Sequence, residues 1–127
     1  MSVCIDYDTA LTLVNDEVAK EGPDYIYPFP RCVNVREGED GELYGACLVG
    51  RAVIQGGVPV EDLILFPDAD IETIRAQGIV KLTEKAEAFL VAVQTCQDDG
   101  GEWGTAVHWA TERANGDMNP LDDTMYR

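Results

Sequence analysis

The histidine and tryptophan side chains of this chain all lie in one short stretch, residues 100–110, which reads GGEWGTAVHWA. His108 is the single histidine, and Trp103 and Trp109 are the two tryptophans. An imidazole near neutral pH can act as a general acid or base or bind a metal. Any Ser-His-Asp or Cys-His arrangement in this chain would require His108. The chemistry therefore depends on whether His108 faces a pocket.

The surrounding pattern predicts an ordinary packed helix. At about 100° per residue, one face of that helix collects a large anchor and several small residues: Trp103, Ala106, Val107, Ala110 and Ala114. His108 falls on the opposite side, four residues before Glu112. A catalytic or metal-binding imidazole needs a pocket and an orienting partner. We therefore predict that His108 is solvated and that Trp103 anchors the helix in the core.

Trp109 lies at the flank of that apolar face and leaves two interpretations open. A tryptophan in this position can cover the edge of the core. It can also anchor an interface, since tryptophan is enriched in binding hot spots.

Paired carboxylates are the other residues that could do chemistry: Asp6/Asp8, Asp68/Asp70, Asp98/Asp99 and Asp122/Asp123. The stretch DADIE lacks the glycine and the twelve-residue ligand spacing of an EF-hand. Each pair is explained by a helix cap or a solvated loop. The motifs GxGxxG, GxxxxGK, GxSxG and HExxH do not occur. We predict no catalytic residue, cofactor or metal site. A small carboxylate-dependent enzyme remains an alternative, ranked below the two hypotheses given at the end of this subsection.

The four cysteines do not have the spacing of a metal site. Cys4, Cys32, Cys47 and Cys96 are too far apart for a CxxC knuckle. We predict that they are reduced thiols, buried as small hydrophobic residues.

Charge excludes some partners and favours others. The chain has 24 acidic and 9 basic residues, a formal net charge of −15. Such a field repels the phosphates of nucleic acids and anionic lipids, so neither is an expected partner. Many acidic residues fall in the predicted connections, and those we select as candidate binding residues, together with Trp109, are Glu37, Glu39, Asp40, Glu42, Glu61, Asp62, Asp68 and Asp70. Gathered on one side, they could bind a basic patch on another protein.

Helical patterns account for most of the chain. We predict helices over residues 9–21, with Asp8 as the N-cap and Gly22 as the stop, and over 46–57, 59–64, 71–77, 84–99 and 102–115. Asp68 or Asp70 would cap the fourth of these helices, and Thr83 the fifth. Glu84 and Glu87 are expected on the solvated face of the fifth helix.

Strand patterns are few and short. Residues 2–6 read as a short strand, and 31–35 and 42–45 as a hairpin around a polar turn. Residues 116–127 show no periodicity and are expected to be a loosely held tail. The predicted fold is α-dominant α+β, with four or five helices around one core and a small antiparallel β-hairpin. At 127 residues and 46% hydrophobic, residues 1–127 can form a single domain.

Residues 1–20 lack the basic and apolar regions of a signal peptide. The longest apolar-leaning run, GACLVGRAVIQGG, is interrupted by Arg51 and is too short to span a bilayer. A cytoplasmic protein that does not associate with membranes is expected.

Three segments carry a resemblance to a known family: DYIYP, CLVGRAVIQGGV and QTCQDDGGEWGTAVHWA. Over about residues 9–112 the chain resembles a family of small uncharacterised proteins of actinobacteriophages, mycobacteriophages especially. The resemblance implies expression in the cytoplasm of a bacterial host and an accessory role toward host or defence proteins. The leading hypothesis is a non-enzymatic acidic accessory protein that binds a basic patch on the surface of a host protein. The alternative is a self-associating, scaffold-like protein, such as a homodimer, with Trp109 at its interface.

Overall fold

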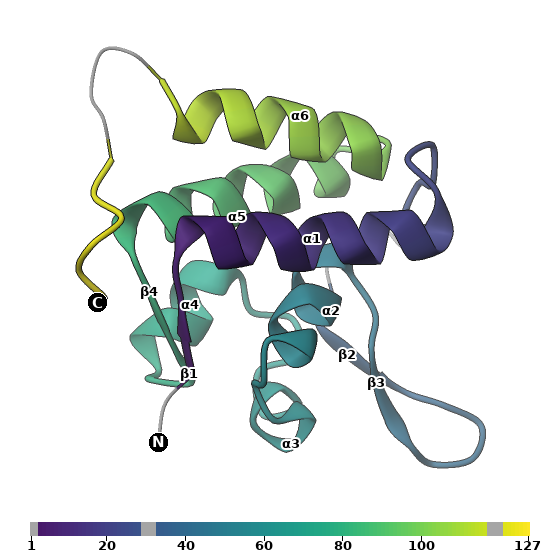
Figure 1. Ribbon diagram of the computed structural model, residues 1–127. Coiled ribbons are helices and arrows are strands. Elements are labelled where there is room, and N and C mark those ends of the chain that lie inside the picture. The colour runs from purple at the N-terminus through teal and green to yellow at the C-terminus, as the bar shows by residue number, and fades with distance from the viewer. Residues whose placement is uncertain (1–2, 29–32, 117–120) are drawn as a thin grey trace.

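Three long helices form the upper layer of the molecule. The structure, a computed structural model, describes residues 3–28, 33–116 and 121–127. Helices α1 (Tyr7–Glu21), α5 (Glu84–Asp98) and α6 (Trp103–Ala114) pack side by side, as Figure 1 shows. The shorter helices α2 (Leu48–Gln55), α3 (Val60–Leu63) and α4 (Ile71–Ala76) lie below them with the strands. The α-dominant α+β class is confirmed, and each of the six helices in the described part of the chain overlaps one of the predicted helical ranges, of which four or five were expected around the core.

Two small sheets complete the fold. Strands β2 (Val35–Glu37) and β3 (Leu43–Gly45) form the expected antiparallel hairpin. Strand β1 (Val3–Ile5) confirms the short N-terminal strand, and it pairs in parallel with β4 (Val80–Leu82), which the sequence did not predict.

The first hairpin strand begins later than expected, at Val35 rather than residue 31, and residues 31 and 32 lie outside the described residues. The reason is Asn34, which bonds to other segments. Its backbone N–H donates to the carbonyl of Pro67, and its side-chain amide donates to the carbonyl of Ala69, both at 2.8 Å. Its own carbonyl accepts from the N–H of Ala46 at 3.0 Å. The bonds to Pro67 and Ala69 tie the start of the hairpin to the connection between α3 and α4, whereas the bond from Ala46 joins the two arms of the hairpin.

Gly50 allows this arrangement. A Cβ atom added to Gly50 would lie 2.4 Å from the carbonyl oxygen of Asn34, well inside contact distance. Helix α2 can therefore approach the hairpin only because residue 50 has no side chain.

Side-chain caps set the helix starts. Asp6, rather than Asp8, caps α1 by accepting from the N–H of Thr9 at 2.9 Å. The helix starts two residues earlier than expected, and Tyr7 in this added part is buried, with its ring edge-on to that of Phe89. Asp70 and Thr83 cap α4 and α5 as predicted.

Two buried glutamines of α5 complete the caps of distant helices. The side-chain oxygen of Gln97 accepts from the N–H of Leu48 at 2.9 Å, at the start of α2. The side-chain oxygen of Gln94 accepts from the N–H of Ile71 at 3.1 Å, at the start of α4. Free backbone N–H groups at helix starts need acceptors when they are buried. Helix α5 thereby organises the lower layer.

Residues 121–127, expected to be loosely held, run along β4 and make several bonds. Asp123 accepts from the N–H of Tyr7 at 2.8 Å and from the hydroxyl of Thr83 at 2.7 Å. The backbone N–H of Arg127 donates to the carbonyl of Leu82 at 2.9 Å.

Glu87 was expected on a solvated face, and this prediction is wrong. Its side chain is buried and pairs with Arg75 and with Arg127, the latter at 2.9 Å. The carboxylate of Glu87 therefore links α5 both to α4 and to the C-terminal segment, residues 121–127.

Candidate protein-binding surface

The hairpin tip presents four exposed carboxylates on a well-defined turn. Glu37 ends β2, and Glu39, Asp40 and Glu42 follow in the connection to β3. The N–H of Gly38 donates to the carbonyl of Glu42 at 2.8 Å, and Asp40 accepts from the N–H of Glu42 at 3.0 Å. These bonds hold the turn, and the acidic side chains project from it into solvent.

A second acidic group lies on α3 and on the connection to α4. Glu61 and Asp62 occupy the first turn of α3, where negative charge is favourable, and both are exposed. Asp68 and Asp70 are also exposed, and Asp70 additionally caps α4. Helix α3 packs against β3, and in Figure 1 it lies at the same lower end of the molecule as the hairpin. The two groups together, eight side chains, are called the acidic surface below.

Four basic side chains pair with other carboxylates. Lys20 pairs with Glu17 at 2.7 Å and Arg51 with Glu21 at 2.9 Å, while Arg75 and Arg127 both pair with Glu87. Within residues 3–28, 33–116 and 121–127, none of the eight carboxylates of the acidic surface forms an ion pair. Their charge is left for solvent or for a partner.

His108 lies where the helical pattern predicted. Its side chain is 77% exposed, and its Nε2 lies 3.2 Å from the carboxylate of Glu112. Trp103 faces the core and is fully buried. No three His, Cys, Asp or Glu side chains gather closely enough to hold a metal ion among the described residues.

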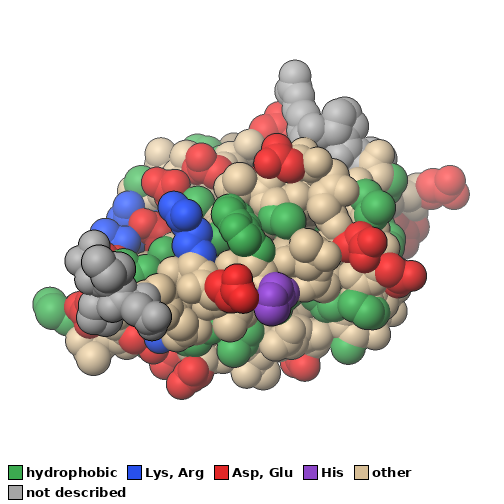
Figure 2. All heavy atoms as spheres, turned by 90° about the horizontal axis from the view of Figure 1, so that it is seen from above, with side chains coloured by type: hydrophobic (Ala, Val, Ile, Leu, Met, Phe, Trp, Pro, Cys, Tyr) green, Lys and Arg blue, Asp and Glu red, His purple; other side chains and the backbone are tan. Residues whose placement is uncertain are grey.

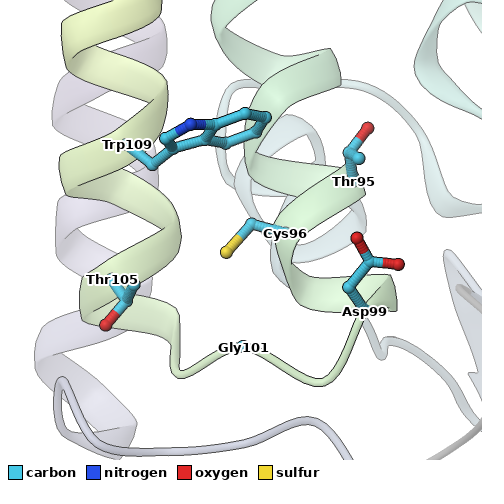
Figure 3. A pocket seen from close by; sticks show the side chains of 6 residues that line it. All are labelled: Thr95, Cys96, Asp99, Gly101, Thr105 and Trp109. Carbon is cyan, nitrogen blue, oxygen red and sulfur yellow. The ribbon is translucent and has the colours of Figure 1, made fainter.

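Trp109 forms one wall of a surface groove between α5 and α6. The groove has a volume of about 330 Å³ and is lined by Thr95, Cys96, Asp99, Gly101, Thr105 and Trp109. Figure 3 shows the indole on α6 facing α5, the sulfur of Cys96 pointing into the space between the helices, and Gly101 in the loop that closes one end. Trp109 is 41% exposed. These six residues are called the Trp109 groove below.

Only Trp109 of this groove was selected from the sequence. Cys96 faces it because α5 and α6 pack together, and a periodicity within one helix does not predict which residues of the next helix it will meet. Gly101 is required for the closure of the loop, since an added Cβ would lie 2.8 Å from the carbonyl oxygen of Cys96.

Burial raises the pKa values of two groups beside the groove. Partial burial, with a contribution from the neighbouring Asp99, raises the pKa of the Asp98 carboxyl. Burial, again with a contribution from Asp99, raises the pKa of the Cys96 thiol. A raised thiol pKa keeps Cys96 protonated and weakly nucleophilic at neutral pH.

The cysteines are less uniformly buried than predicted. Cys47 is buried, but Cys96 is half-buried and Cys4 is exposed, because Cys4 occupies the outward position of β1 between Val3 and Ile5. Cys32 lies outside the described residues.

Figure 2 shows the distribution of charge on the face seen from above. Lys and Arg side chains gather at the left of this view, and Asp and Glu side chains lie beside them and across the rest of the face, around the single histidine and patches of hydrophobic side chains.

We found no match to a family model, to a curated protein or to a solved structure. Among the described residues, no helix combines the length and the hydrophobicity needed to cross a bilayer. The function must therefore be inferred from the surface itself.

Proposed function

We propose that this chain is a non-enzymatic, acidic accessory protein of a bacteriophage, and that it binds a host protein through a basic patch on that protein. One observation carries the proposal. The eight carboxylates of the acidic surface are exposed and have no ion pair in the described part of the chain, while four basic residues pair instead with Glu17, Glu21 and Glu87. An unpaired surface of this kind attracts a complementary positive surface and speeds encounter with it.

The arrangement of the surface supports binding beyond mere solubility. The hairpin is anchored to the α3–α4 connection by the hydrogen bonds of Asn34, so both acidic groups are held relative to each other. A fixed array of charges loses less conformational entropy on binding than charges on a flexible tail. The resemblance to actinobacteriophage proteins supplies the biological context of the proposal, a host protein in the bacterial cytoplasm.

Affinity capture tests the proposal. The immobilised chain is exposed to mycobacterial lysate beside a variant in which Glu37, Glu39, Asp40 and Glu42 are replaced by Gln or Asn. We expect the wild type, and much less the variant, to retain a protein with a basic surface patch. A matched control replaces Asp8, Asp16, Glu84 and Glu112, four exposed acidic residues outside the acidic surface. Equal loss of capture in both variants would show that only net charge matters and would contradict the proposal.

A further inference from the structure

The Trp109 groove combines an apolar wall with an uncompensated negative helix end. Helix α5 ends at Asp98 with Asp99 as its C-cap, and its last turn contains no basic residue. The C-terminus of a helix carries partial negative charge, so cations are favourable there and carboxylates are not. Two adjacent carboxylates at this end therefore leave a place where a positive group would be stabilised.

A second hollow lies next to the Trp109 groove and is also lined by acidic residues. It is lined by Pro23, Asp24, Glu102, Gly104, Thr105 and His108, so it shares Thr105 with the Trp109 groove. Asp24 and Glu102 are exposed acidic residues. An apolar group in the Trp109 groove would thus have carboxylates on both sides, Asp99 on the α5 side and Asp24 with Glu102 beyond Thr105 on the α6 side.

A second copy of the chain fits this surface poorly. Each copy carries a formal charge of −15, and facing copies would bring like charges together. A stable interface also buries about 800 Å² on each partner. A groove lined by six residues, with a volume near the lower end of the range of about 300–1,000 Å³ for ligand sites, fits a short segment better.

We propose that the Trp109 groove binds an extended segment of a partner protein in which an apolar side chain is flanked on both sides by Lys or Arg. The apolar side chain packs against the indole of Trp109 and beside Cys96. The flanking cations face Asp99 on one side and Asp24 and Glu102 on the other. The proposal rests on the proposed function in one respect only, that the partner is a protein with a basic surface.

The probe is an acetylated and amidated pentapeptide with a central leucine between two pairs of lysines. Its binding to the full chain is followed by NMR at physiological salt, through the backbone amide signals of Gly101 and Thr105, which line the groove and are present in every variant. We expect Trp109→Ala to weaken binding by about tenfold or more, as for aromatic hot-spot residues. Asp99→Asn should weaken it by about two- to fivefold, the range of an exposed ion pair. The matched controls Tyr44→Ala, another exposed aromatic residue, and Asp8→Asn should bind like the wild type.

Two further peptides test the chemistry of the occupant. A peptide with glycine in place of leucine, and one with glutamates in place of lysines, should both bind at least about tenfold more weakly. Equal binding of the glycine peptide would overturn the proposal, because charge alone would explain the interaction. A dimer that forms in sedimentation and is lost in Trp109→Ala would assign the groove to a second copy and overturn it as well.

The hairpin variant separates this proposal from the proposed function. Neutralising Glu37, Glu39, Asp40 and Glu42 should leave peptide affinity within about twofold, since the hairpin lies at the opposite end of the molecule from α6. If capture of a host protein fails while leucine-peptide binding depends on Trp109, the groove proposal stands alone. A large loss of peptide binding in the hairpin variant would contradict the groove proposal.

Discussion

Replacing Trp103 measures how the last helix is anchored. The Trp103 side chain is fully buried, with its ring edge-on to Tyr25 at a centroid distance of 4.5 Å and with Arg51 over it at 5.1 Å. Trp103→Ala would remove a large aromatic side chain from a packed core. Comparable substitutions lower the free energy of unfolding by about 3–5 kcal/mol, and we expect a loss in this range.

Trp103→Phe should cost far less than its loss of volume suggests. The indole N–H of Trp103 is buried and forms no hydrogen bond in the described part of the chain. A buried donor without an acceptor costs about 1–3 kcal/mol, and phenylalanine removes that donor. The smaller ring leaves a cavity whose cost is of similar size and opposite sign. We therefore expect Trp103→Phe to lower the free energy of unfolding by no more than about 1 kcal/mol.

Urea denaturation followed by circular dichroism gives the free energy of unfolding of each variant. His108→Ala is the matched surface control from the same helix, and it should change that free energy by less than about 0.5 kcal/mol. A loss for Trp103→Phe as large as for Trp103→Ala would refute the account of the unsatisfied donor. Equal losses for Trp103→Ala and His108→Ala would refute the assigned orientation of the helix.

Three further substitutions test other parts of the fold. Gly50→Ala should lower the free energy of unfolding by more than about 2 kcal/mol in urea denaturation, because its Cβ would collide with the backbone of Asn34. Glu87→Gln should lower it by about 1–3 kcal/mol, because two arginines lose a charged acceptor; no change would mean that the pairs are not formed. Asp98→Asn should raise the melting temperature at pH 7 but not at pH 3. The pKa of Asp98 is raised in the folded state, so stability is lost as the pH rises from about 3.8 through that raised pKa, and asparagine removes this loss.

Local signals predicted most of the helices. Thr83, Asp70 and Gly22 act within one turn of the chain, through a cap or a stop, and the structure places them as the sequence indicated. The orientation of α6 also followed from residues within one helix, with Trp103 buried and His108 exposed. Such features depend on neighbours three or four residues away, which a sequence pattern displays directly.

Long-range partners account for what was missed. Residues 80–82 form strand β4 because they pair with β1, which is far away in the sequence. A segment of three residues has too little periodicity to be predicted as a strand by itself. Asn34, Gln94 and Gln97 are polar residues buried because they satisfy the backbone groups of other segments. A polar residue is expected to be exposed when only the sequence is known. The distant backbone groups whose hydrogen bonds allow these three side chains to be buried can be identified only in the folded structure.

The candidate surface was predicted in part. The sequence selected the acidic residues of the hairpin and of α3, and the structure adds that they are exposed and without ion pairs in its described part. Trp109 was selected as a flank residue with two interpretations. The groove beside it required the packing of α5 on α6, which brings Cys96 and Asp99 opposite the indole.

The association rate constant with the captured host protein shows whether the acidic surface steers binding. Stopped-flow measurements compare the wild type with the variant neutralised at Glu37, Glu39, Asp40 and Glu42, between about 50 and 500 mM salt. We expect salt to slow association of the wild type by about tenfold or more, with a much smaller change in dissociation, and we expect the variant to associate slowly at every salt concentration. An association rate that depends neither on salt nor on the hairpin carboxylates would contradict binding through the acidic surface.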